Sequence, residues 1–445
     1  MHAMAGTTSV FGLPIVWVAS SLLVATYAAV ISEKFNRAVI ALLGAGLMII
    51  LGILTQEEAV EGIDFNTIGL LIGMMMIVSV TRRTGLFEYL AIWAAKLVKA
   101  NPAAIMIMLQ IVTAVVSALL DNVTTVLLVI PVTLVICERL GVKPYPFLVG
   151  QVLASNIGGT ATLIGDPPNI LIGSRVGLGF TDFVLNLAPV VVIAQSSALV
   201  ILHLVWGRRL STTEAARAKV MAFNERSAIV DRGLLTKSLI VLACVITGFT
   251  LAHQLHVEPA SVALFGAAAL LLLSCVGKKA EAQTKLVSKC FEEVEWITIF
   301  FFVGLFIVIY GVQSTGILSI LAEGLLDITG GDLRITTIAV LWASAILSSI
   351  VDNIPFVATM IPLVKEMAPT FGGPEGLMPI WWALSLGACF GGNGTLVGAS
   401  ANLAVAGLAE HAGIRFVFVE FAKIAFPVML VTVFIAMIYV ELRYL

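Results

Sequence analysis

The chain has 445 residues, of which 60% are hydrophobic and only 12% are charged, and its formal net charge is −2. A soluble domain carries about 25% charged residues, so this composition excludes an ordinary soluble enzyme. The near-neutral charge offers no basic surface for nucleic acid. Repeated apolar runs of spanning length predict instead an all-α polytopic membrane protein in the plasma (inner) membrane, surrounded by the lipid bilayer.

The predicted segments follow one another in chain order. Residues 1–37 form an extra N-terminal transmembrane helix, centred on 14–32, which we interpret as a span because a clear small-residue cleavage site is missing. The first half, 38–206, contains apolar segments at 38–54, 64–80, 103–137, 147–177 and 183–206. A basic linker, 207–236, is expected in the cytoplasm. The second half, 237–445, contains segments at 237–253, 259–276, 295–312, 335–364, 378–408 and 423–441.

The two halves share a repeated pattern. The stretch 117–131 reads SALLDNVTTVLLVIP, and 348–362, at an offset of 231, reads SSIVDNIPFVATMIP. A second block, GGTATLIGDPPN at 158–169, aligns with GGNGTLVGASAN at 391–402 at an offset of 233. The distribution of Lys and Arg between loops predicts that the copies face opposite ways. Inverted repeats with broken helices are typical of secondary transporters.

Two segments are too long for one span and short for two. We predict that 103–140 and 335–364 are re-entrant helical hairpins, with Asp121-Asn122 and Asp352-Asn353 at their tips. Turn chemistry accounts for the two asparagines about as well as function does. A carboxylate near the membrane midplane costs ~3 kcal/mol and marks a functional site by default, so the aspartates favour function.

Two further segments, 147–177 and 378–408, contain glycines and prolines that oppose a continuous helix. Unwound backbone at membrane depth is tolerated where it is buried in protein or lines a cavity, so we predict two broken transmembrane helices beside the hairpin tips. Close helix packing explains some of the glycines as well. The candidate solute- or ion-binding residues are Asp121, Asn122, Thr124, Thr125, Asn156, Gly158, Gly159, Thr160, Thr162, Asp166 and Asn169 in the first half, and Asp352, Asn353, Gly391, Gly392, Asn393, Thr395, Ser400 and Asn402 in the second.

At these motifs the chain resembles the ion-transporter superfamily over nearly its whole length. DNVTTVLLVIPV, SNIGGTATLIGDPPN and GACFGGNGTLVGASAN are especially similar to the branch that holds bacterial arsenite permeases, NhaD-type sodium/proton antiporters and the melanosomal P protein. The resemblance implies a scaffold domain and a moving transport domain, with hairpins and broken helices meeting at one site. It also implies a homodimer, and for some arsenite permeases a soluble ATPase partner.

The charge of the motifs narrows the choice of transported solute. Three aspartates (Asp121, Asp166 and Asp352) occur in the motifs and no Lys or Arg does, which disfavours a sodium-coupled organic anion transporter. Neutral arsenite or antimonite, exported in exchange for protons carried by these aspartates, is the first hypothesis. A Na⁺/H⁺ antiporter that uses the same oxygen ligands is the alternative.

The remaining chemistry-bearing residues are scattered. The five cysteines form no CxxC pair, and Cys389, beside the second glycine-rich break, is interpreted as a small apolar filler. His253 and His256 have HxxH spacing at a predicted outer helix end without an obvious third ligand. We therefore expect no metal site, no cofactor and no enzymatic activity.

Overall fold

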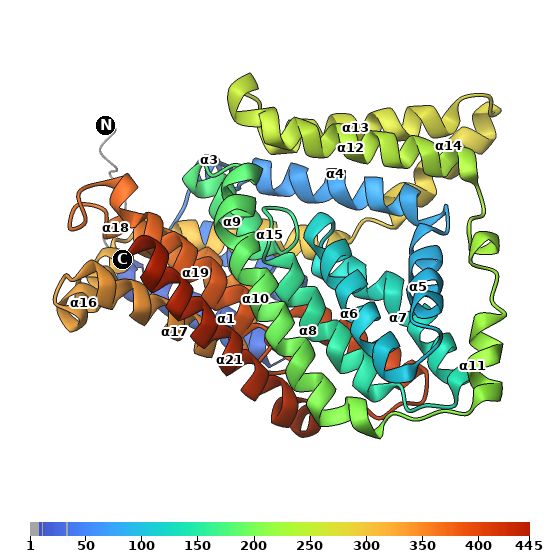
Figure 1. Cartoon of the computed structure of the whole chain (residues 1–445). Coiled ribbons are helices and arrows are strands. Elements are labelled where there is room, and N and C mark those ends of the chain that lie inside the picture. Colours follow the sequence, from blue (N-terminus) through green and yellow to red (C-terminus); the bar gives the residue numbers. More distant parts are fainter. Residues whose placement is uncertain (1–8, 11, 33) are drawn as a thin grey trace.

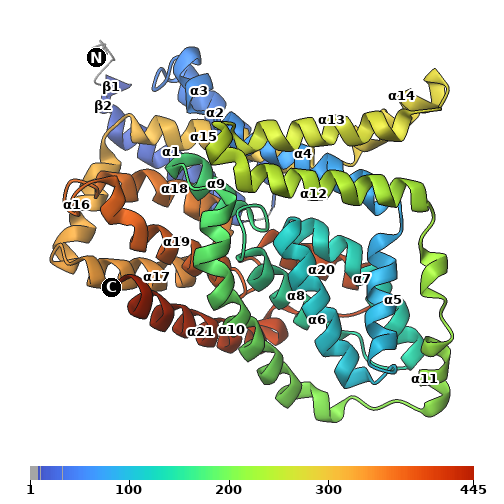
Figure 2. The same ribbon diagram turned by 45° about the horizontal axis from the view of Figure 1, so that its top comes forward.

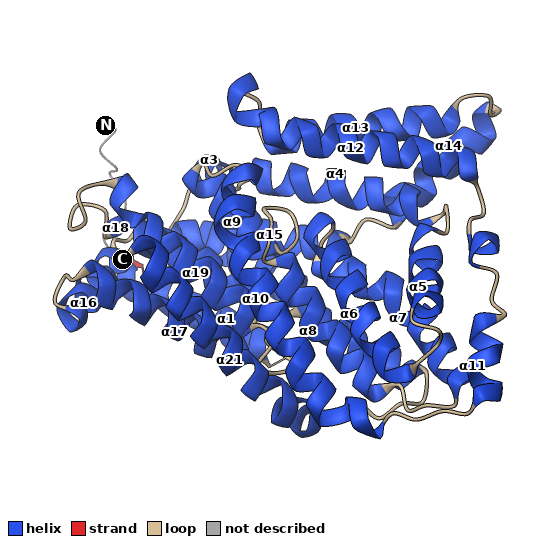
Figure 3. Ribbon diagram, in the orientation of Figure 1, coloured by secondary structure: helices blue, strands red, loops and turns tan. Residues whose placement is uncertain are grey.

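The computed structural model describes residues 9–10, 12–32 and 34–445, and the predicted N-terminal unit begins in residues outside this range. Within it, nearly all secondary structure is helical (Figure 3). The one β pair described joins β1 (Ser9–Val10) to β2 (Leu13–Pro14). Eight of the described helices are long and apolar enough to cross a membrane. The predicted fold class, an all-α polytopic membrane protein, is confirmed.

The helices of the first half and the linker have the following bounds. They are α1 (Ile15–Ile31), α2 (Arg37–Ile50), α3 (Gln56–Gly62), α4 (Phe65–Arg82), α5 (Leu86–Leu97), α6 (Pro102–Leu119), α7 (Asn122–Leu140), α8 (Tyr145–Gly159), α9 (Pro167–Val176) and α10 (Phe180–Trp206). The linker contains η1 (Gly207–Arg209), α11 (Glu214–Met221) and η2 (Glu225–Ala228).

The second half continues the pattern. Its helices are α12 (Arg232–Leu255), α13 (Pro259–Cys275), α14 (Ala280–Glu292), α15 (Trp296–Gln313), α16 (Ile317–Thr329), α17 (Leu333–Ile350), α18 (Asn353–Glu366), η3 (Pro374–Leu377), α19 (Met378–Gly391), α20 (Ser400–His411) and α21 (Phe418–Tyr444).

The helices divide into two groups. One, which we name the scaffold layer, comprises α1, α2, α4, α12, α13 and α15; α2 packs along α15, and α4 packs along α13. Figures 1 and 2 both show α12 and α13 side by side along one edge of the molecule, next to α4. The other group, the hairpin bundle, comprises α6–α10 and α17–α21, in which α6 packs on α8 and α17 on α19.

Two helix pairs in the bundle turn sharply at an Asp-Asn pair. α6 ends at Leu119 and α7 begins at Asn122, while α17 ends at Ile350 and α18 begins at Asn353. Both aspartates are N-caps: Asp121 accepts from the Thr124 backbone N–H at 2.8 Å, and Asp352 from that of Ile354 at 3.1 Å. Helix capping thus uses one oxygen of each carboxylate.

The two halves hold their hairpins by matching contacts. The Ser117 hydroxyl donates to the Ser155 carbonyl, and the Ser348 hydroxyl donates to the Ala388 carbonyl, both at 2.7 Å. A second pair of contacts also matches between the halves: the Thr162 hydroxyl donates to the Ala118 carbonyl, and the Thr395 hydroxyl donates to the Ser349 carbonyl. We propose an internal duplication on the strength of these contacts, and the opposite orientation of the copies stays a prediction.

Candidate functional site

The hairpin tips and the broken helices converge on a small cavity, here called the central cavity. Its volume is about 20 Å³, room for one water molecule or a monatomic ion. The polar residues that line it are Arg37, Asp121, Asn122, Asp166, Glu295, Thr298, Asn353 and Ser400. They come from both halves of the chain and from both helix groups.

Asp166 is the most enclosed carboxylate of this site, with no exposed surface. The Asn122 amide donates to its Oδ1 at 3.2 Å, and the Asn353 amide donates to the same oxygen at 3.3 Å. The first asparagine is at the tip of one hairpin and the second at the tip of the other. A buried carboxylate therefore joins the two hairpins through amide donors, which lower the cost of removing it from water.

The amide network continues behind the cavity. Asn122 also donates to Asn156 at 3.1 Å, and Asn156 donates to Asn393 at 3.0 Å and to Asn402 at 2.9 Å. All four side chains are buried. Among the described residues no group accepts a hydrogen bond from Nδ2 of Asn393. Since a buried donor without a partner costs about 1–3 kcal/mol, this amide is suited to an oxygen-bearing solute or a water molecule.

Other predicted residues have structural roles in the broken helices. The Asn169 amide holds the α8–α9 loop by donating to the carbonyls of Thr160 and Thr162, and Asn402 likewise bonds the carbonyls of Gly392 and Thr395. The Thr160 hydroxyl donates to the Asn156 carbonyl. These residues lie behind the cavity rather than on its wall, so they shape the broken helices.

The predicted glycines allow close backbone packing. A Cβ at Gly158 would lie 2.4 Å from Cα of Ala114, and one at Gly391 would lie 2.7 Å from Cα of Ala345. Gly159 and Gly392 approach Gly165 and Gly398 across their loops. The packing explanation left open by the sequence therefore applies to all four positions.

The two hairpin threonines differ in their surroundings. Thr124 is half-buried and lines a separate pocket of about 60 Å³, which shares Glu295 with the central cavity. Thr125 is fully buried, and within the described part of the chain its hydroxyl has no partner. Cys389 is buried with its Sγ 3.6 Å from Oδ1 of Asn169, as fits a small side chain among polar neighbours.

Sequence reasoning missed three polar residues of the central cavity, namely Arg37, Glu295 and Thr298. Arg37, the first residue of α2, contacts Asp352 at 3.1 Å and Ser400 at 2.5 Å. No Arg or Lys occurs in the motifs that contain the three aspartates, but the fold places Arg37 beside one of them. The prediction of a site without a basic residue is therefore wrong. Arg37 ends the predicted N-terminal unit 1–37, where Lys and Arg served only as an orientation signal, whereas Glu295 was visible as the first residue of the predicted segment 295–312.

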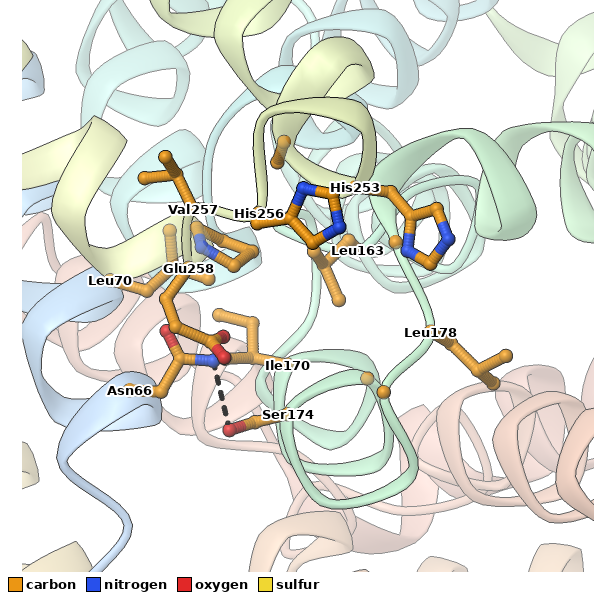
Figure 4. Close-up of a pocket in the computed structure, with 15 residues that line it drawn as sticks. Asn66, Leu70, Leu163, Ile170, Ser174, Leu178, His253, His256, Val257 and Glu258 are labelled. Carbon is orange, nitrogen blue, oxygen red and sulfur yellow. Dashed lines mark hydrogen bonds between the residues drawn. The ribbon is translucent and has the colours of Figure 1, made fainter. Parts of the chain in front are cut away.

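A larger pocket of about 380 Å³, the outer pocket, lies at the far end of α9 (Figure 4). Asn66, Ser174, His253, His256 and Glu258 supply its polar wall, and the last three are exposed. It contains none of the predicted binding residues. We place the functional site at the central cavity despite its smaller volume, because the buried carboxylate of Asp166 and the buried amides of Asn122 and Asn353 converge there.

The C-terminal turn of α9 is fixed to the scaffold layer beside the outer pocket. Asn66 donates to Ser174 at 3.1 Å, as Figure 4 shows, and Ser174 donates to Asp64 at 2.9 Å. Arg175 lies 3.3 Å from Asp64 and donates to the Gly62 carbonyl at 2.7 Å. α9 therefore connects the central cavity at one end with a scaffold contact at the other.

Membrane-spanning helices, two broken segments and a buried polar site between them define a multi-pass membrane transporter. The family model described as "Citrate transporter" (CitMHS) matches residues 27–387. The chain belongs to this family, within the ion-transporter superfamily, and is a transporter rather than an enzyme.

Relatives and solved structures agree with this assignment. The chain is 46% identical over 432 residues to an uncharacterized transporter of Mycobacterium tuberculosis, covering 96% of this chain and 98% of the relative. It is 33% identical to the human P protein, covering 95% of this chain and 59% of that protein, which confirms the resemblance to the P-protein branch. The Alcanivorax borkumensis YdaH transporter has a similar fold, with a TM-score of 0.62, 14% identity, and coverage of 96% of this chain and 98% of that one. Neisseria gonorrhoeae MtrF, from a study of antimetabolite efflux pumps, gives a TM-score of 0.56 at 10% identity, covering 97% and 96%.

Proposed function

We propose that this transporter is a secondary active transporter that couples proton uptake to the outward movement of a small neutral or cationic solute. Arsenite or antimonite is the first candidate. The observation that carries the proposal is the charge of the central cavity. Asp121, Asp166 and Glu295 line it, Asp352 adjoins it, and Arg37 is the single cation among the described residues of its wall. The carboxylates outnumber the cation, so an organic trianion would meet net repulsion.

The amides support an oxygen-bearing solute. Arsenite at neutral pH is As(OH)₃, whose hydroxyls can both donate to carboxylates and accept from amides. Asn393 offers a buried donor behind the cavity, and Asp121, on its wall, has one oxygen that is not used in capping. The buried Cys389 supplies a single thiol, whereas a thiolate cage for arsenic needs several. We therefore assign solute binding to oxygen and nitrogen groups, and proton carriage to Asp121, Asp166 and Asp352.

Sodium/proton antiport is the second candidate, and a specific observation favours it. The cavity of about 20 Å³ accommodates a monatomic ion in the described conformation, and carboxylate and amide oxygens are hard ligands of the kind that such cations prefer. Citrate, named in the family description, is the third solute to compare.

The deciding experiment uses proteoliposomes that contain the purified transporter and a trapped pH-sensitive dye. Arsenite, antimonite, Na⁺ and citrate are added separately. The proposal predicts a proton flux with arsenite or antimonite that is lost in Asp121→Asn and in Asp352→Asn, while membrane insertion is unchanged. A flux with Na⁺ alone identifies the antiporter, and a flux with citrate alone refutes the charge argument.

A further inference from the structure

Arg37 is held by the central site through several contacts. Its guanidinium donates to Oδ2 of Asp352 at 3.1 Å, to the hydroxyl of Ser400, and to that of Thr298 at 3.1 Å. It also lies over the ring of Phe301, 5.2 Å from the centroid. The side chain is 26% exposed and that of Asp352 is 14% exposed. The pair is therefore shielded from much of the solvent that weakens surface ion pairs.

This contact crosses the boundary between the two helix groups. Arg37 begins α2 of the scaffold layer, whereas Asp352 caps α18 and Ser400 begins α20, both in the hairpin bundle. The pair opens onto a crevice of about 320 Å³, the inner crevice, whose wall also includes Phe35 and Leu403. The basic loop beside α2 predicts that this crevice faces the cytoplasm.

Arg37 occupies the position that a bound cation would need. Oδ1 of Asp352 caps α18 by accepting from the Ile354 backbone, and Oδ2 accepts from both Arg37 and Ser400. Both oxygens therefore accept hydrogen bonds, and Oδ2 accepts two. A guanidinium does not lose its proton at physiological pH. A cation or proton that binds Oδ2 therefore competes with Arg37, and displacement of Arg37 breaks a contact between the helix groups.

We propose that Arg37 is a positioning residue that couples occupancy of Asp352 to movement of the hairpin bundle against the scaffold layer. Arg37 and the transported or coupling cation compete for Asp352. With the site empty, Arg37 holds the bundle at the inner crevice and assists release to that side. The proposal rests on the secondary-transport function proposed above and adds to it the residue that links binding to movement.

In the first test, a fluorescent label on α20 reports the response to Na⁺ added on the inner-crevice side. The Na⁺ concentration that gives a half-maximal response is measured at several fixed pH values, with choline as the inert cation. Wild type, Arg37→Gln, Arg37→Lys and Lys34→Gln are compared. Lys34→Gln is the matched control, because it removes an exposed positive charge from the same loop. The charged groups that face the site are Arg37, Asp121, Asp166, Glu295 and Asp352.

Competition predicts that Arg37→Gln lowers the half-maximal Na⁺ concentration by about tenfold. If protons are the competing ion, the same tenfold change raises the half-maximal pH by about one unit. Arg37→Lys should restore part of the wild-type response, and Lys34→Gln should match wild type. The effect of Arg37→Gln must vanish in an Asp352→Asn background and persist in an Asp121→Asn background, as a double-mutant cycle requires. An unchanged response to both ions in Arg37→Gln, or an effect that survives Asp352→Asn, overturns the proposal.

A second readout separates this proposal from the proposed function. Spin labels at exposed positions of α2 and α20 report the distance between the scaffold layer and the hairpin bundle without any transported solute. If Arg37→Gln removes the short-distance population in the empty protein, the coupling role stands even when arsenite, antimonite and Na⁺ all fail to drive flux. If solute flux occurs and the distance distribution is the same in Arg37→Gln and wild type, the function stands and the coupling role is refuted.

Discussion

Replacement of Gly158 by alanine tests how the first hairpin is held against its broken helix. The added Cβ would lie 2.3 Å from the carbonyl oxygen of Ala114 and 2.4 Å from its Cα. Ordinary contacts begin near 3.4 Å, so α6 and α8 must separate by roughly 1 Å. The obstacle is backbone, which cannot rotate away as a side chain can. Overpacking costs about 1–3 kcal/mol, and we expect the upper end here.

The assay is thermal unfolding of the purified transporter in detergent, with Gly407→Ala as the matched control. Gly407 lies in α20, and a Cβ there would meet nothing within 4 Å. Alanine has the higher helix propensity by about 1 kcal/mol, so this control should be at least as stable as wild type. Gly158→Ala should unfold roughly 5 °C lower. Equal midpoints for the two variants would refute the claim that glycine is required for backbone approach.

Three further predictions concern contacts outside the cavity wall. Ser348→Ala removes the buried hydroxyl bonded to the Ala388 carbonyl and should destabilise the protein by about 1 kcal/mol in thermal unfolding. Ser319→Ala, which removes a solvent-exposed bond from a half-buried hydroxyl to Glu366, should have a smaller effect. The Lys96 ammonium at 2.5 Å lowers the pKa of Glu225 in the linker. This tether is present above the ordinary Glu pKa and is lost as pH falls through the lowered value, so limited proteolysis of the linker should accelerate in acid and already be fast at pH 7 in Lys96→Gln. Tyr27→Phe, which removes the bond from α1 to the Pro355 carbonyl at 2.9 Å, should lower thermal stability by about 1 kcal/mol without loss of insertion, and an unchanged midpoint would contradict this.

The sequence allowed the fold class and the groups around Asp166 to be predicted because both depend on local patterns. Apolar runs predict spans, and Gly-Pro clusters predict breaks. Asn122 and Asn353 were predicted as site residues because they stand at the middle of segments of the wrong length for a span. Their common hydrogen-bond acceptor, Asp166, required the fold, since the three residues are far apart in the chain.

Arg37 could not be predicted for a physical reason. A long side chain at a helix N-terminus can reach the lipid headgroups, the solvent or the protein interior, and its own sequence neighbourhood does not distinguish these outcomes. In the fold it points at Asp352, 315 residues away. The sequence interpretation treats loop charges as signals of orientation and motif charges as part of the site. Arg37 belongs to both groups, so that distinction does not hold for this residue.

The differences between the two halves indicate where the function lies. The serine, threonine and glycine contacts that hold the hairpins occur in both halves, and so do the tip aspartates Asp121 and Asp352, but the other charges around the cavity are not all repeated. The position that corresponds to Asp166 in the second half is Ala399, and among the described residues an arginine contacts the aspartate of the second hairpin tip but not that of the first. Duplicated contacts stabilise a common framework, while a single buried carboxylate and a single guanidinium make the two tips chemically unequal. Such an inequality allows the two tips to differ in their affinity for a solute or a coupling cation. Asp166 and the Arg37–Asp352 pair are therefore where solute selectivity and ion coupling should be altered first.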